Sequence, residues 1–151
     1  MSRHRLGVSL SRAHHAFMAV LDAELRACGL AGSVRAGMGP VVFELLEEDD
    51  LTLTELSARA RLAQSTVTEI TTKMAAAGLL RRRPDPRDGR ASLVRLTPKA
   101  RALRSKLREL DRRLNQAFAV ELSARELATL IRLLERLRSA LTSERARRGS
   151  G

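Results

Sequence analysis

Aromatic side chains are almost missing from this chain of 151 residues, which has no tryptophan, no tyrosine and three phenylalanines. Proteins that bind single-stranded nucleic acid usually stack the bases on aromatic rings, so the composition disfavours that class. Cys28 is the only cysteine, which excludes an internal disulfide and fits a reducing cytoplasm. No apolar run approaches the ~18 residues needed to span a bilayer, and the first ten residues are too polar for a secretory signal.

Residue patterns for catalysis or metal binding are also lacking. The sequence has no glycine-rich phosphate loop, no Ser/His/Asp arrangement and no Cys/His cluster, so we expect no enzyme, no cofactor and no metal site. His14 and His15 are adjacent, and on a helix they point about 100° apart, which makes a shared ion difficult. The acidic run 47–50 (EEDD) imitates a metal site, but we expect a solvated helix end and loop. Cys28 is expected to be a small buried hydrophobe.

Positive charge, by contrast, is abundant and unevenly distributed. The net charge is +11, which favours a polyanion or an anionic membrane surface as partner. Residues 73–108 include twelve basic and two acidic residues, whereas residues 41–72 include two basic and seven acidic ones. Concentration of the excess in one segment favours a basic binding surface over a general contribution to solubility.

The densest basic segment, RRRPDPRDGR at residues 81–90, cannot be a regular helix. Pro84 and Pro86 interrupt a helical run, and Asp88-Gly89 is typical of a turn. We therefore expect a hairpin in which LLRRRP and ASLVRL are the strands and DPRDGR is the turn, with its arginines in solvent. A membrane-surface protein is disfavoured, because such proteins carry their basic charge on an amphipathic helix.

Helices are expected in most of the remaining chain. Apolar residues recur at helical spacing, capping boxes occur at Thr52–Glu55 and Ser123–Glu126, and Gly29 and Gly78 are suited to helix ends. The expected helices cover residues 9–28, 34–48, 52–61, 65–77, 98–120 and 123 to about 143, with residues 144–151 frayed. The long terminal helices carry more apolar surface than a small core can cover, which suggests a helical dimer interface.

The helix expected at residues 65–77 has an unusual polar face. Threonine is a mediocre helix former, and solvated helix faces usually carry glutamate, lysine and arginine. Short hydroxyl side chains suit a surface that approaches another molecule closely. The residues that begin this face are Ser65, Thr66, Thr68 and Thr72.

In this order of elements, the sequence resembles the MarR family of bacterial transcriptional regulators. The resemblance is strongest over residues 51–100, and its most specific parts are STVT (65–68), GLL (78–80), DPRDGR (85–90) and LT (96–97). It implies a mainly α fold with a small β-hairpin wing: a winged helix-turn-helix in a homodimer with a helical dimerisation region. The implied DNA-binding lobe is residues 34–97, and the implied dimerisation region is residues 1–30 and 98–148 of a single MarR-like domain.

The implied function is that of a sequence-specific regulator of transcription. Such a protein binds double-stranded DNA at an inverted-repeat, pseudo-palindromic operator as a homodimer, and here is expected to be a cytoplasmic repressor that responds to a ligand. The alternative is a non-specific architectural or adaptor protein that binds DNA through its basic face. A purely electrostatic binder is expected to carry lysine and arginine on the helix at 65–77, which this chain does not.

The resemblance also implies roles for individual residues. Arg87 corresponds to the wing-tip arginine that enters a minor groove, and Asp85 would hold its guanidinium. Arg90 would either clamp a phosphate or pair with Asp88, and strand arginines, Arg82 and Arg95 among them, would add phosphate contacts. The candidate DNA-binding residues are Gln64, Ser65, Thr66, Thr68, Thr72, Lys73, Arg81, Arg83, Asp85, Arg87 and Arg90.

Two positions depart from the family pattern. Glu69 stands where a basic or amide residue often faces DNA, and it would either accept from a cytosine or pair with Lys73. Thr71 occupies a position that is commonly apolar. The docking mode is therefore better supported than any assignment of bases.

Members of this family often sense small aromatic acids in a cleft between the dimer helices and the DNA-binding lobe. Arg35 would hold a ligand carboxylate or pair with an acidic neighbour, while Phe17, Met18 and Phe43 are more simply interpreted as core residues. A small aromatic or carboxylate effector is thus a candidate partner. The candidate pocket residues are His14, Phe17, Met18, Arg35, Met38 and Phe43.

Overall fold

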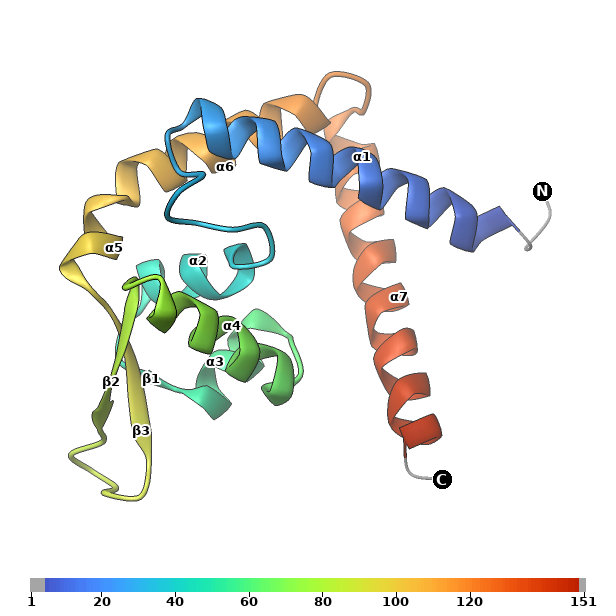
Figure 1. Ribbon diagram of the computed structural model, residues 1–151. Helices are drawn as coiled ribbons and strands as arrows, with labels where there is room; N and C mark the ends of the chain where they lie inside the picture. Colours follow the sequence, from blue (N-terminus) through green and yellow to red (C-terminus); the bar gives the residue numbers. More distant parts are fainter. Residues whose placement is uncertain (1–4, 150–151) are drawn as a thin grey trace. The chain divides into compact units, whose positions relative to one another are not determined.

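A computed structural model describes residues 5–149, which divide between residues 111 and 112 into two compact units. Figure 1 follows the chain through both units. The elements are α1 (Leu6–Ala27), α2 (Gly39–Glu47), β1 (Leu51–Thr52), α3 (Leu53–Ala60), α4 (Gln64–Ala76), β2 (Leu80–Pro84), β3 (Ser92–Leu96), α5 (Pro98–Ala102), α6 (Arg104–Phe118) and α7 (Ala124–Gly149). The mainly helical fold with a β-hairpin wing is therefore confirmed.

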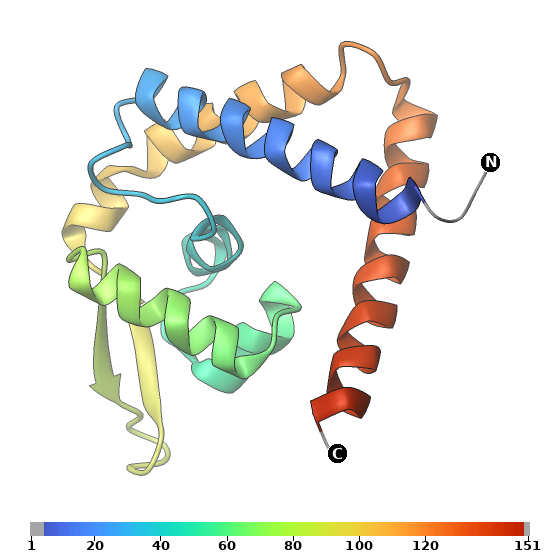
Figure 2. The same ribbon diagram turned by 45° about the vertical axis from the view of Figure 1, so that its right-hand side comes forward.

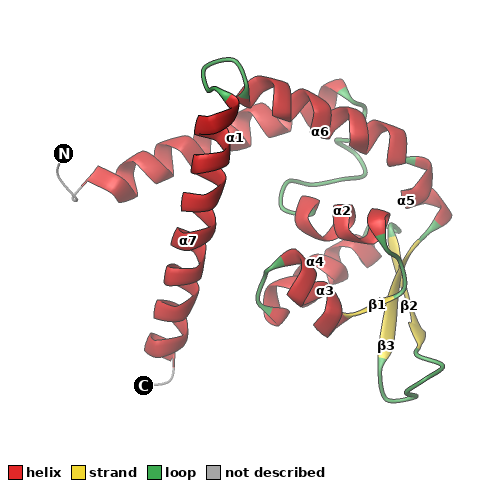
Figure 3. Ribbon diagram, turned by 180° about the vertical axis from the view of Figure 1, so that it is seen from behind, coloured by secondary structure: helices red, strands yellow, loops and turns green. Residues whose placement is uncertain are grey.

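The sheet of the first unit has one strand more than the sequence predicts. The expected hairpin is present, with Leu80 opposite Leu96 and Pro84 opposite Ser92. β1 pairs with the other edge of β3, giving the antiparallel order β1-β3-β2 (Figure 3). Two residues are too short to produce an alternating pattern, and Thr52 is also the N-cap of α3, so β1 had no independent sequence signal.

A tight connection joins α3 to α4. The capping box is confirmed: the hydroxyl oxygen of Thr52 accepts from the backbone N–H of Glu55 at 3.2 Å, and the Glu55 carboxylate accepts from the Thr52 N–H at 2.8 Å. α3 ends at Arg61, whose φ of 52° is left-handed. α4 begins three residues later, at Gln64. These two helices and their turn have the order of a helix-turn-helix.

Two of the expected helices differ from the structure. The second helix begins at Gly39 rather than at residue 34, because Gly37 has a φ of 93° and Pro40 belongs to the first helical turn. The helix expected over 98–120 is divided at Leu103, whose N–H bonds to the Ala100 carbonyl three residues back. A tightened turn of this kind interrupts the helix without disturbing the apolar spacing.

The expected fraying from residue 144 was also wrong up to Gly149, where α7 ends; residues 150–151 lie outside the described chain. Glu144 forms ion pairs with Arg147 at 3.0 Å and Arg148 at 2.7 Å. Pairs three and four residues apart support a helix. The second capping box is confirmed at the other end of α7, where the Ser123 N–H donates to Glu126 at 2.9 Å.

The core of the first unit lies among α2, α3, α4 and the sheet. Figure 2 looks nearly along α2, with α3 and α4 on one side of it. Burying apolar side chains from all of these elements holds α4 and the hairpin on one scaffold. The buried side chains include Val41, Val42 and Leu45 of α2, Leu56 of α3, Val67 and Met74 of α4, and Leu93, Val94 and Leu96 of β3.

Candidate nucleic-acid interface

The polar face of α4 is exposed. Val67, Thr71 and Met74 are fully buried, and this anchors one side of the helix to the core. Ala63, the N-cap, makes no side-chain cap hydrogen bond, so the first-turn amides are not capped by that residue and are suited to an anion. On the outer side, Thr66 is half-buried, and the exposed candidates are Gln64, Ser65, Thr68, Thr72 and Lys73.

The threonine hydroxyls of α4 donate to the helix itself. Thr68 donates to the Gln64 carbonyl at 2.8 Å, and Thr72 donates to the Thr68 carbonyl at 2.8 Å. With their protons used inside the helix, these exposed hydroxyls offer acceptor lone pairs and methyl groups to a partner. Thr71 is the buried departure from the family pattern, and its hydroxyl is satisfied by the Thr68 carbonyl at 3.0 Å.

Glu69 and Lys73 form an ion pair on the exposed face of α4. The ammonium lies 2.6 Å from the carboxylate, one helical turn away. The hydrogen bond and the charge of Lys73 hold the pKa of Glu69 below its ordinary value. Of the two alternatives for Glu69, the free chain therefore adopts the pairing with Lys73, and the charge of this face is close to neutral.

At the hairpin tip, a buried carboxylate anchors an exposed arginine. Asp85 is 6% exposed, and its Oδ1 accepts from the Arg87 backbone N–H at 2.9 Å and from Nε at 3.4 Å. The Arg87 side chain remains 74% exposed. The backbone hydrogen bond of Arg87 is the main reason that the pKa of Asp85 is lowered, and it outweighs partial burial. The predicted Asp85–Arg87 pair is thus present.

The other basic residues of the hairpin differ in whether their side chains are bound by acidic residues of the same chain. Arg81 and Arg82 are exposed, and so is Arg90, whose backbone N–H donates to Asp88 at 3.0 Å. Arg83 was predicted to meet DNA, but its Nε donates to Asp50 at 2.9 Å. Its guanidinium is therefore committed to a carboxylate of the same chain.

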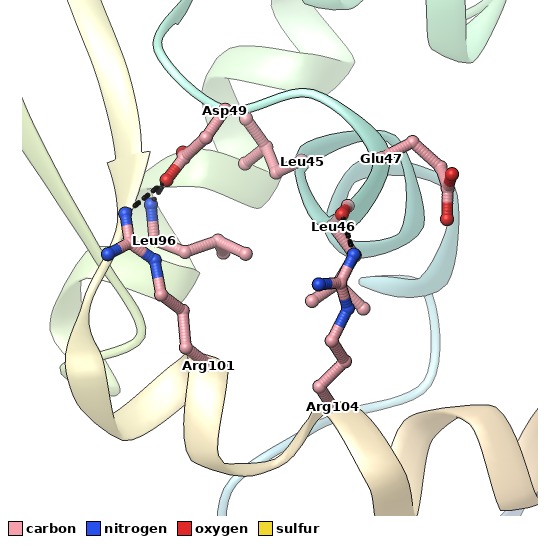
Figure 4. Close-up of a pocket in the computed structure, with 7 residues that line it drawn as sticks. All are labelled: Leu45, Leu46, Glu47, Asp49, Leu96, Arg101 and Arg104. Carbon is pink, nitrogen blue, oxygen red and sulfur yellow. Dashed lines mark hydrogen bonds and ion pairs between the residues drawn. The ribbon is translucent and has the colours of Figure 1, made fainter.

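The acidic run 47–50 is a solvated helix end only in part: Glu47 and Glu48 are exposed, whereas Asp49 and Asp50 are half-buried. Glu48 pairs with Arg59 at 2.6 Å, and Asp50 with Arg83 and with Arg95, the latter at 2.8 Å. Asp49 accepts from the Leu96 N–H at 3.0 Å and from the Arg101 guanidinium, as Figure 4 shows. The pairs of Asp49 and Asp50 join segments far apart in the sequence, so no local pattern predicted them.

Two of the six candidate pocket residues line one cavity against α4. Arg35 and Met38 line a cavity of about 360 Å³ against α4, together with Thr66, Glu69 and Lys73 among others. The remaining candidates, His14, Phe17, Met18 and Phe43, do not line it. Met18 and Phe43 are half-buried and His14 and Phe17 are exposed, so the alternative of a core position was wrong for Phe17.

A second cavity, of about 430 Å³, lies between the end of α2 and the start of α5 and α6. Figure 4 shows that both of its arginines point toward acceptors of the same chain: Arg101 toward Asp49, and Arg104 toward the Leu46 carbonyl. Its polar groups thus connect α2 to the helices that follow the sheet.

The described part of the chain also bears on two other kinds of feature, a metal site and a membrane-spanning helix. Among residues 5–149, no group of three or more His, Cys, Asp or Glu side chains is placed to hold a metal ion. Within the same residues, none of the helices combines the length and the apolar character that crossing a membrane requires. Cys28 is half-buried rather than buried.

Together, α3, its turn, α4 and the β2–β3 hairpin define a winged helix-turn-helix protein. Residues 40–92 match the sequence model of the MarR family. Residues 40–92 of this chain are therefore similar to the DNA-binding region of the MarR family.

A similar protein of known function is consistent with this assignment. The chain is 32% identical over 95 residues to the HTH-type transcriptional repressor IacR of Pseudomonas putida, a match covering 63% of this chain and 57% of that protein. It thus spans less than two thirds of that relative's length.

Two solved structures are similar over most of their length. The PcaV transcriptional regulator from Streptomyces coelicolor, in complex with its natural ligand, is 27% identical with a TM-score of 0.74, covering 93% of this chain and 94% of that one. A probable transcriptional regulator from Pseudomonas aeruginosa is 26% identical with a TM-score of 0.73, covering 88% and 96%.

Proposed function

We propose that this protein is a repressor in the cytoplasm that binds a pseudo-palindromic operator in double-stranded DNA as a homodimer and is released by a small ligand. One observation carries the proposal: the exposed polar face of α4 and the arginine-bearing hairpin belong to the same compact unit. A single docking can therefore present α4 to a major groove and the hairpin to the minor groove beside it.

On α4, the chemistry suits base edges better than phosphates. Gln64 is able to pair with adenine, and threonine methyls are able to contact a thymine methyl. Because Thr68 and Thr72 already donate their hydroxyl protons to the helix, their lone pairs favour a donor such as the amino group of adenine or cytosine. The uncapped first turn adds a place for one backbone phosphate.

In the hairpin, Arg87 has the properties required to enter a minor groove. Its guanidinium is exposed, and the buried Asp85 fixes its backbone and lies near Nε. A·T-rich minor grooves are narrow and concentrate negative potential, which attracts such an arginine. Arg81, Arg82 and Arg90 are exposed and suited to phosphates.

The homodimer is supported by apolar surface that the single chain leaves in water. Within residues 5–149, the exposed large apolar side chains lie between Leu6 and Val20 and between Phe118 and Leu141. α7 is 26 residues long and has no buried residue. Exposed apolar side chains along long helices favour an interface, and a two-fold pair of identical chains is the commonest solution. A mass of two chains in sedimentation at micromolar concentration is expected.

For the effector, we propose the cavity lined by Arg35 and Met38. Its lining combines apolar residues, including Pro40 and Ile70, with the basic residue Arg35, so it suits a small aromatic carboxylate. The Streptomyces relative was solved with its natural ligand, which supports ligand binding in this fold. Because Thr66, Glu69 and Lys73 of α4 line the same cavity, an occupant would alter the helix that reads DNA. Calorimetric titration with aromatic acids, repeated on Arg35→Ala, tests this assignment.

The proposal is tested by competition between operator candidates and random duplex. Inverted repeats from the region upstream of the gene are bound to the protein at matched salt, and affinity is measured by mobility shift. We expect tight binding to one repeat, with half-sites about one helical turn apart. Equal affinity for every duplex would instead support the architectural or adaptor alternative.

A further inference from the structure

The last residue of the acidic run, Asp50, holds two arginines of the wing. It directly precedes β1 and has a φ of 60°, a region that Asp and Asn adopt more readily than most side chains. One carboxylate oxygen accepts from Arg83 Nε at 2.9 Å, and the other lies 2.8 Å from an Arg95 Nη. The Asp50 side chain is 22% exposed, so water screens these pairs only in part.

Strand register explains why a carboxylate is needed at this place. Arg81 of β2 lies opposite Arg95 of β3. Since side chains alternate along a strand, Arg83 shares the face of Arg81 and Arg95. Like charges directly opposite each other destabilise a sheet, and Arg95 Nε is buried without a hydrogen-bond partner. Asp50 offsets this crowding.

Neighbouring contacts fix the position of Asp50. Asp49 accepts from the Leu96 N–H at 3.0 Å and from Arg101, which ties the loop to the end of β3 and to α5 (Figure 4). Partial burial raises the pKa of Asp50, but the hydrogen bond and charge of Arg83, followed by those of Arg95, outweigh it and leave the pKa below the ordinary value of 3.8. Asp50 is therefore an anion at neutral pH.

We propose that Asp50 is a specificity-determining positioning residue that occupies Arg83 and Arg95 in place of DNA phosphates. This inference rests on the proposed function of the hairpin in binding DNA. Every arginine that meets a phosphate strengthens binding to all sequences alike and steepens the dependence on salt. By holding two arginines, Asp50 limits the sequence-independent affinity, while Arg87 and the polar face of α4 remain free to meet DNA.

The experiment measures the salt dependence of binding to random duplex for Asp50→Asn. Asparagine keeps the shape and tolerates the left-handed backbone, so the fold should persist, which circular dichroism verifies. The slope of log K against log salt is expected to steepen by about 1 to 2, because each released arginine adds ~0.9. Adding Arg83→Gln and Arg95→Gln to Asp50→Asn should remove the gain.

The matched control is Asp22→Asn on α1. It makes the same change in net charge and releases Arg26, the ion-pair partner of Asp22, at a site outside the hairpin. An equal steepening in both variants would mean that net charge alone is responsible, and would overturn the proposal.

A second arm keeps the test decisive if Asp50→Asn fails to fold. In the otherwise unchanged protein, Arg83→Gln with Arg95→Gln should leave the salt slope as it is, because these arginines do not meet phosphates. A slope shallower by about 2 would contradict the proposal. Failure of the proposed function is distinguishable, since it would appear as loss of operator preference in the unchanged protein, whatever the slopes.

Discussion

The two surfaces assigned to DNA are built in opposite ways. The exposed face of α4 carries amide and hydroxyl side chains together with an ion pair between Glu69 and Lys73 that is internal to the helix. The hairpin carries exposed arginines, and of residues 81–84 every one is exposed. Neutral groups form hydrogen bonds with DNA only when they are precisely positioned. The position of α4 is fixed by its three buried side chains. Charges act over longer distances. We therefore expect α4 to determine most of the specificity for a DNA sequence, and the hairpin to supply most of the affinity for DNA.

The largest expected effect is that of Arg87→Ala. Because Arg87 is exposed and held at the tip by Asp85, its loss should weaken operator binding by roughly 1–3 kcal/mol. Fluorescence anisotropy at fixed salt provides the measurement, and discrimination for A·T pairs beside the half-sites should decline with it. Arg87→Lys is the control that keeps the charge and loses the planar fork. Undiminished operator affinity in the alanine variant would remove the hairpin from the interface.

A smaller effect is expected for Thr68→Val on α4. Valine keeps the shape and one methyl but removes the hydroxyl oxygen, so operator affinity should fall by about 0.5–1.5 kcal/mol, the usual value of one hydrogen bond. Affinity for random duplex and the salt slope should stay unchanged, in contrast to the variants of the hairpin. Parallel losses on operator and random duplex would mean that α4 meets only the DNA backbone.

Glu69→Gln should change the affinity for DNA by a smaller amount. It should also make binding by α4 depend more on charge, as binding by the hairpin does. The substitution releases Lys73, which the carboxylate holds at 2.6 Å. Binding to random duplex should strengthen, and the salt slope should steepen by about 1. Adding Lys73→Gln should restore the original slope; if it does not, the gain comes from the lost repulsion of Glu69 rather than from Lys73.

The smallest expected effect is a difference in stability at acid pH. Asp85 has a pKa lowered from 3.8 in the folded chain, first by the Arg87 backbone hydrogen bond. Its contribution to stability is therefore complete above pH 3.8 and is lost as pH falls through the folded-state value. The melting temperature should decline less steeply below pH 3.8 in Asp85→Asn than in the unchanged protein. Coincident profiles would mean that Asp85 does not stabilise the folded tip.

Local signals in the sequence predicted the elements of the interface. The Thr52–Glu55 capping box, the left-handed Gly78 and the turn residues of 85–90 each specify their own neighbourhood, so α3, the end of α4 and the hairpin were correctly expected. The pair between Asp85 and Arg87 is only two residues apart and was also correct. Their roles toward DNA stay predictions.

Contacts between distant segments were beyond the sequence. Asp50 meets Arg83 across 33 positions, and Asp49 meets Arg101 across 52. No periodicity records such pairs, because they depend on β1 joining β3. The break at Leu103 was missed for a different reason: the apolar spacing continues through it while the backbone does not.

Hydroxyl-radical footprinting of one operator, with the unchanged protein and with Arg87→Ala, tests the central claim most directly. The account predicts two protected half-sites centred about one helical turn apart, flanked by minor-groove protection that disappears only in the variant. A single protected site, or flanking protection that persists without Arg87, would contradict a two-fold pair of chains that places α4 and the hairpin on adjacent grooves.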